Sequence, residues 1–169
     1  MTISLYAASV PVLKQMLNSV SDILRKAEDY AVTKNIDPQA LLQARLYPDM
    51  FPLVRQVQLV GDFARAIPAR LSGTDVPKHP DTETSFAELQ TLLAETIAYL
   101  DGYTPAQIDG NESREIVLRA GTPNERKMQG LSYLLHFGLP QFFFHVTTTY
   151  AILRHNGLDI GKRNYMGAY

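Results

Sequence analysis

Apolar residues recur at spacings of three and four in four long stretches of the chain, a pattern typical of helices that bury one face. These stretches run over about 5–34, 50–70, 86–100 and 140–156. Pro11 falls early in the first stretch, so either the regular helix begins there or the helix is kinked. The pattern predicts an all-α fold built from four long helices.

Capping residues and prolines indicate where these helices begin and end. Asp49 is the predicted N-cap of the helix over 50–70, and Pro68 predicts a kink or an end near its last turn. The stretch 72–84 is rich in Gly, Pro, Ser and Thr, which predicts a long surface loop. Ser85 and Glu88 then form a capping box at the start of the next helix.

Before the last helix the pattern changes from helical spacing to alternation. The stretch 114–119 alternates and contains β-branched residues, and 120–124 carries Gly and Pro. These features predict a small β-hairpin whose second arm begins near Glu125, and 158–169 is expected to be a tail. We therefore expect a single domain over 1–169, folded as a four-helix bundle with a long loop and a hairpin before the last helix.

The last predicted helix carries a polar seam within its apolar face. Pro140 suits its first turn, and Gly157 suits the left-handed position just after its end. At about 100° per residue, several residues fall within about 60° of His145: Gln141, Thr148, Thr149, Ile152 and Asn156. Because polar side chains in a buried stripe need partners, this seam is the first candidate for a functional site.

Two glutamines of the helix over 50–70 lie on different faces of that helix. By the same spacing Gln56 lies within the buried stripe of that helix. Gln58 projects towards the side of Asp62 and Arg65, which we expect to be solvated. Gln56 is therefore the inward-facing glutamine of this helix, and Gln58 is its rival.

Three interpretations stay open for His145 and Gln141, taken together with Gln56, which a family resemblance places at the matching position of its helix. Two amides and an imidazole can satisfy one another as a buried hydrogen-bond network that fixes the helix register. They can also line a pocket for a small molecule, or hold a divalent metal. Thr148 and Thr149 are further candidates for the ligand pocket, although threonine in a helix commonly donates to its own preceding turn.

The remaining histidines are weaker candidates. His79 lies in the polar loop and is expected to be exposed, while His155 is placed to interact with the dipole at a helix end. His136 precedes Gly138, so helical spacing does not give its direction. The run 142–144 has three Phe residues, at least one of which must leave the core side, and this surplus predicts a homodimer contact or packing under the long loop.

Composition narrows the choice of partners and of compartment. The net charge of −1 and the lack of a basic patch disfavour nucleic acid and anionic membranes as partners. The sequence has no cysteine, which excludes disulfides, a thiolate nucleophile and a zinc finger. Neither a signal peptide nor a membrane-spanning stretch is evident. We expect a cytoplasmic protein.

Two stretches resemble a known family. The phrase FHVTTTYAILRHNG, with RLYPDMFPLVRQVQLVGDFA upstream, resembles a bacterial and fungal family named only as a domain of unknown function. That family belongs to the DinB/YfiT-like superfamily of four-helix bundles. The resemblance implies this fold for the whole chain.

The resemblance also implies a metal site, from which this sequence departs. Relatives hold a divalent ion with three histidines, and some use it to activate a thiol for transfer. The matching positions here carry Gln56, Gln141 and His145, and glutamine is a weak ligand for zinc or nickel. We expect a small-molecule-binding or vestigial enzyme-like bundle. The alternatives are a metal-dependent thiol transferase and a non-catalytic interaction or scaffold protein.

Overall fold

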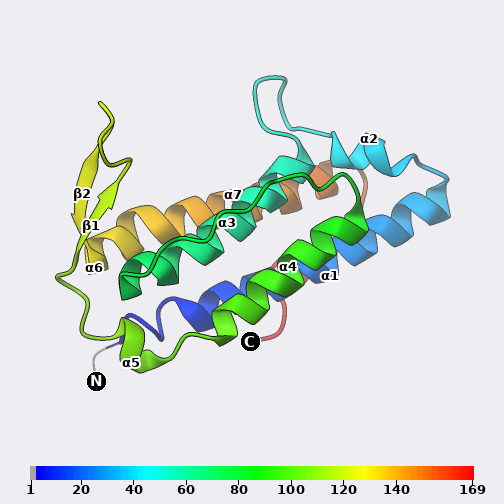
Figure 1. Cartoon of the computed structure of the whole chain (residues 1–169). Coiled ribbons are helices and arrows are strands. Elements are labelled where there is room, and N and C mark those ends of the chain that lie inside the picture. The colour runs from blue at the N-terminus through cyan, green and yellow to red at the C-terminus, as the bar shows by residue number, and fades with distance from the viewer. Residues whose placement is uncertain (1–2) are drawn as a thin grey trace.

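The computed structural model describes residues 3–169 and contains four long helices, as the sequence predicts. The helix α3 packs against α4 and α7, and α1 packs against the same two helices, so the four close around one apolar core (Figure 1). These helices are α1 (Val10–Lys34), α3 (Leu53–Ser72), α4 (Phe86–Asp101) and α7 (Leu139–His155). The all-α four-helix architecture is confirmed.

A long loop joins two of these helices that run in the same direction. Figure 1 shows α3 and α4 side by side, with the loop 73–85 returning along the bundle between the end of one and the start of the other. The helix α3 has 20 residues, and at 1.5 Å per residue it is about 30 Å long. An extended loop of this length can cover that distance. The predicted loop therefore lies against the bundle.

The start of α3 differs from the prediction. The helix begins at Leu53, where Pro52 is the N-cap with an extended ψ of 167°, so Asp49 is not its cap. Nor does Pro68 end the helix, which continues to Ser72. A proline removes one backbone hydrogen bond from a helix, but Pro68 is buried among core residues whose packing outweighs that loss. At α1, by contrast, Pro11 lies in the first turn, as one of the two alternatives predicted.

The capping box of α4 is formed as predicted. The backbone N–H of Glu88 donates to Ser85 Oγ at 3.2 Å, and the N–H of Ser85 donates to Glu88 Oε2 at 3.1 Å. Short helices fill the connections: α2 (Pro38–Leu42), α5 (Pro105–Ile108) and α8 (Lys162–Met166). The last of these lies in the predicted tail and packs on α1, where Ser19 Oγ donates to the carbonyls of Asn164 and Tyr165 at 2.8 and 2.7 Å.

The β-hairpin is also confirmed, and it leads directly into the last helix. Its antiparallel strands are β1 (Glu115–Leu118) and β2 (Arg126–Gln129), with Leu118 opposite Arg126. The chain then continues without a break through α6 (Gly130–Tyr133), a π-helical turn η1 (Leu134–Gly138) and α7. Helix α7 begins at Leu139 with Pro140 in its first turn, as predicted, but the chain is already helical from Gly130, which was not predicted. Wider π turns are local adjustments of a helix, and this one directly precedes α7, whose first turn holds the proline.

Gly138 lets this last helix approach α3 closely. A Cβ atom at Gly138 would lie 3.0 Å from Ile67 Cγ1, which is closer than ordinary van der Waals contact. The glycine therefore brings the π turn next to the middle of the bundle. Within residues 3–169, no helix is long and apolar enough to cross a membrane.

Candidate functional site

Helices α3 and α7 bring Gln56 and His145 together inside the bundle. The distance between His145 Nδ1 and Gln56 Oε1 is 2.8 Å. Both side chains are buried, and 7% of His145 is exposed. Gln56 is thus the glutamine that meets the seam, as the helical spacing indicated, and the contact is a direct hydrogen bond.

The hydrogen bonds of Gln56 fix the tautomer of His145. The Gln56 Nε2–H group donates to the carbonyl of Phe51 at 3.1 Å, so the amide oxygen Oε1 faces the imidazole. An amide oxygen can only accept, and therefore Nδ1 of His145 carries the proton. The other ring nitrogen, Nε2, is left with a lone pair.

Aromatic rings enclose the imidazole. Phe63 stacks on it with ring centroids 5.5 Å apart and an angle of 15° between the planes. Phe144 approaches edge-on at 5.2 Å and 87°. Burial, together with the charge of Arg55, lowers the pKa of His145 from 6.5 to about 4. His145 is therefore neutral at physiological pH.

The other seam residues do not join this pair. Thr148 Oγ1 donates to the carbonyl of Phe144 at 2.7 Å, and Thr149 Oγ1 donates to that of His145 at 2.9 Å. Both hydroxyl protons are thus used within α7. Gln141 is half-buried one turn before His145, and it makes no hydrogen bond to a side chain in the described part of the chain. Of the five predicted residues, only Gln56 and His145 meet.

This arrangement does not fit the three-ligand metal site of the superfamily. A cation would bind His145 through the lone pair of Nε2, at about 2.0–2.1 Å for zinc. Gln56 Oε1 lies on the opposite edge of the ring, against Nδ1–H. Within residues 3–169, three His, Asp or Glu side chains lie close enough together to share an ion, and His145 is not one of them. Gln56 therefore orients the imidazole and does not complete a metal site with it.

The face of α3 that carries Gln58 and Arg65 is buried, which contradicts the prediction of a solvated face. Gln58 Nε2–H donates to Glu83 Oε2 at 2.9 Å, so the long loop covers this side chain. Arg65 is only 6% exposed. Its guanidinium donates to Asp62 Oδ1 and to Thr96 Oγ1 of α4, both at 2.8 Å. The loop 73–85 and α4, which are distant in sequence, exclude water from this face.

Asp62 is affected by the same burial. Desolvation, and then repulsion from Asp81, raise the pKa of Asp62, although the neighbouring Arg65 acts in the opposite direction. Arg65 Nε is buried and has no hydrogen-bond partner among the described residues. Gly61 makes room for this guanidinium, because a Cβ there would lie 3.2 Å from Arg65 Nη1. Asp62, Arg65 and Thr96 thus form a hydrogen-bond network between α3 and α4 that the sequence did not indicate.

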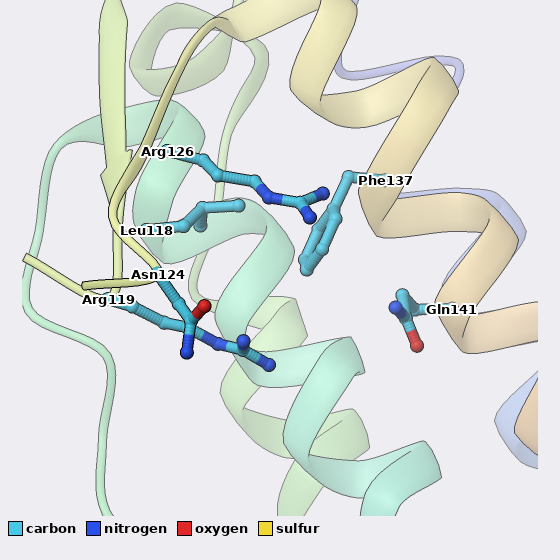
Figure 2. A pocket seen from close by; sticks show the side chains of 6 residues that line it. All are labelled: Leu118, Arg119, Asn124, Arg126, Phe137 and Gln141. Atoms are coloured by element: carbon cyan, nitrogen blue, oxygen red, sulfur yellow. The ribbon is translucent and has the colours of Figure 1, made fainter. Parts of the chain in front are cut away.

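A cavity lies between the β-hairpin and the start of α7. We call it the hairpin cavity; its volume is about 210 Å³, and it is lined by Leu118, Arg119, Asn124, Arg126, Phe137 and Gln141. Figure 2 shows both arginines reaching from the hairpin towards the side chains of Phe137 and Gln141. Neither guanidinium forms an ion pair with another residue in 3–169. Gln141 therefore belongs to this cavity.

The remaining histidines occupy three different environments. His136 is exposed and, with Gln141 and Phe144, lines a further cavity of about 230 Å³. His155 is exposed at the end of α7. His79 is only 20% exposed at its side chain, contrary to the prediction, because it is enclosed by Asp81 and Glu83 of the same loop.

Several of these residues could not be assigned from the sequence pattern. His79, Asp81 and Glu83 alternate along the loop, and this spacing of metal-binding residue types was a visible signal. Arg119 and Arg126 flank the hairpin turn, but only the register of the strands shows that they share a cavity.

Comparisons with known proteins agree with this architecture. Residues 5–166 match the family described as a domain of unknown function, DUF1993. The crystal structure of a DinB family member protein from Shewanella denitrificans is 38% identical, with a TM-score of 0.91 over 98% of this chain and 93% of that one. No curated protein gives a significant match. The chain therefore belongs to the DUF1993 family, which lies within the DinB-like superfamily of helical bundles.

Proposed function

We propose that the protein binds a small organic anion in the hairpin cavity. The observation that carries this proposal is the pair Arg119 and Arg126, which line one cavity without an acidic partner among the described residues. Arginine binds carboxylate and phosphate groups through charge-assisted, often bidentate, hydrogen bonds. A ligand anion would also offset the repulsion between the two guanidinium groups.

The other lining residues indicate the rest of the ligand. Phe137 and Leu118 offer apolar surface, and Gln141 and Asn124 offer amide donors and acceptors. The volume of about 210 Å³ is below the roughly 300–1,000 Å³ typical of drug-sized ligands. The best candidate is therefore a small carboxylate or phosphate ester with a short apolar or aromatic body.

The pair Gln56 and His145 supports this function indirectly. Gln141 and His145 lie one turn apart on α7, so the buried pair fixes the helix that carries one wall of the cavity. This role agrees with a vestigial enzyme-like bundle in which glutamines have replaced metal-binding histidines. The metal-dependent thiol transferase is not favoured, because Gln56 and Nε2 of His145 face away from each other across the ring.

The test is calorimetric titration with benzoate and phenyl phosphate, with benzyl alcohol as the neutral counterpart. We expect the anions to bind and the alcohol to bind at least about tenfold more weakly, since a hydrogen bond to a charged group contributes about 1.5–3 kcal/mol. The double change Arg119→Gln and Arg126→Gln should remove this preference.

Lys127→Gln is the matched control. Lys127 follows Arg126 on β2, so its side chain points to the other face of the hairpin, where it pairs with Glu115 at 3.3 Å. The control removes one positive charge from the same hairpin but outside the cavity, and it should bind the anions as the wild type does. Anion binding that survives in the double variant, or that is lost in Lys127→Gln, would contradict the proposal.

An interaction function has one specific observation in its favour. Phe144 is 55% exposed, and Leu131 and Leu135 on the preceding turns are also exposed. We propose that the exposed ring of Phe144 contributes to the homodimer predicted from the sequence. Sedimentation equilibrium should give a dimer for the wild type and a larger monomer fraction for Phe144→Ser. A monomeric wild type would refute this proposal and leave the ligand proposal untouched.

A further inference from the structure

Three metal-binding side chains gather on the loop 73–85, outside the buried pair of Gln56 and His145. One ligand atom from each of His79, Asp81 and Glu83 lies within 4.8 Å of the other two. His79 Nδ1 is 3.6 Å from Asp81 Oδ1, and His79 Nε2 is 3.4 Å from Glu83 Oε1. We call these three residues the loop cluster. Its imidazole lies between two carboxylates.

Helix α3 holds the outer oxygen of each carboxylate. Arg55 Nη1–H donates to Asp81 Oδ2 at 2.5 Å, and Gln58 Nε2–H donates to Glu83 Oε2 at 2.9 Å. Arg55 also donates to Gln58 Oε1 at 3.2 Å, which joins the two supports. The inner oxygens, Asp81 Oδ1 and Glu83 Oε1, are thereby left facing His79. Such outer hydrogen bonds to ligating carboxylates are the arrangement that orients ligands in metal sites.

An unpaired buried oxygen gives an independent indication of a ligand. Asp81 Oδ1 is inaccessible to solvent and has no hydrogen-bond partner among residues 3–169. A buried carboxylate oxygen without a partner is unfavourable, and a cation would supply the missing interaction. As a whole side chain Glu83 is the more enclosed of the two, with 8% exposed against 24% for Asp81. The carboxylates are therefore built into the fold and are not a solvated acidic patch.

Solvent reaches the cluster through a cavity with acidic walls. This cavity of about 210 Å³ is lined by His79 and Glu83 of the loop and by Glu88 and Glu95 of α4. The acidic lining favours entry of a cation, and the cavity leaves room for water to complete its coordination.

We propose that the loop cluster binds a divalent transition cation of the Zn²⁺ or Mn²⁺ class and thereby fastens the loop 73–85 to α3. One imidazole and two carboxylates are donors that suit these ions, with bonds of about 2.0–2.2 Å to zinc. Asp81 lies at Nδ1 of His79, which also accepts from the backbone N–H of Asp81 at 3.3 Å, and Glu83 lies at Nε2. Because one ion takes one ring nitrogen, binding requires the His79 ring to turn so that a single nitrogen faces both carboxylates, whose ligand atoms lie within 4.8 Å of it. This site is distinct from the superfamily position at His145, and it does not depend on the hairpin cavity.

The test uses the full chain without a histidine tag, freed of metal with a chelator. Titration with ZnCl₂ and MnCl₂, followed by metal analysis after gel filtration, should show one bound ion per chain. His79→Ala should weaken binding by at least about tenfold, because even the loss of an outer-shell partner commonly costs 10–100-fold in affinity. His145→Ala and His155→Ala, which remove histidines outside the cluster, are the controls and should bind as the wild type does.

Two further variants keep the test decisive. Glu83→Gln retains an acceptor for Gln58 and so preserves the loop contact, yet it should lower the affinity as His79→Ala does. Gln58→Leu removes only the support and should weaken binding by about tenfold or more. Circular dichroism checks that each variant is folded. A wild type that binds neither ion, binding that is unchanged in both His79→Ala and Glu83→Gln, or binding lost in His145→Ala instead, would overturn the proposal.

Discussion

Acidification should destabilise the protein through His145. Burial, and then the nearby charge of Arg55, lower the pKa of this imidazole from 6.5 to about 4 in the folded state. At a pH between these two values, His145 binds a proton in the unfolded chain but not in the folded chain. The free energy of unfolding therefore falls as the pH drops through this window, and it is unaffected by His145 above it.

The size of the effect follows from the difference in pKa. A shift from 6.5 to about 4 corresponds to about 3 kcal/mol once the titration is complete. By about pH 4.5 most of this, about 2.5 kcal/mol, should already be lost. For a domain of this size such a loss is a large share of the total stability.

Urea unfolding of the wild type and of His145→Gln measures this loss. Glutamine is polar and does not titrate, and its amide can still donate to Gln56 Oε1. All other titrating groups are the same in the two proteins, so the difference between them reports on His145. We expect the wild type to lose about 2–3 kcal/mol more than the variant between about pH 7 and about pH 4.5. Equal losses in both proteins would refute the neutral, buried state assigned to His145.

Two further substitutions test the packing around the site by the same urea assay. Gln56→Leu leaves Nδ1–H of His145 without an acceptor and should lower the free energy of unfolding by about 1–3 kcal/mol; no loss would contradict the hydrogen bond. Gly138→Ala places a Cβ 3.0 Å from Ile67 and should cost about 1–3 kcal/mol. Gly161→Ala, where a Cβ meets nothing within 4 Å, is its control and should change stability by less than about 0.5 kcal/mol.

Helical spacing was sufficient to predict the bundle and the inward directions of Gln56 and His145, and the family resemblance placed the two residues at one site. Both residues lie in apolar stripes of long helices, and the direction of a side chain on a regular helix follows from its position. Helical spacing did not predict the helical segment 130–138 before α7, whose π turn packs closely against Ile67 of α3. It also missed that Gln141 lies in the hairpin cavity and away from the buried pair.

Burial of charged residues was the main feature that spacing could not reveal. Asp62 and Arg65 form an i,i+3 pair that is typical of a solvated helix face. Arg65 is covered by α4, to which it is bonded through Thr96, and the neighbouring Gln58 is covered by the loop 73–85. Thr96 lies 31 residues after Arg65 in the sequence. The path of the loop could not be predicted from its sequence. Long-range contacts of this kind decide which charges become part of a site.

A small organic anion is proposed to bind between the hairpin and α7. A two-dimensional ¹H–¹⁵N NMR titration with phenyl phosphate tests this proposal most directly, because the shifted amides locate the bound anion residue by residue. We expect these amides to cluster at Arg119, Asn124, Arg126, Phe137 and Gln141, and the shifts to be absent in the double arginine variant. Shifts centred on the loop cluster or on Thr148 and Thr149, or no saturable shifts, would contradict the account.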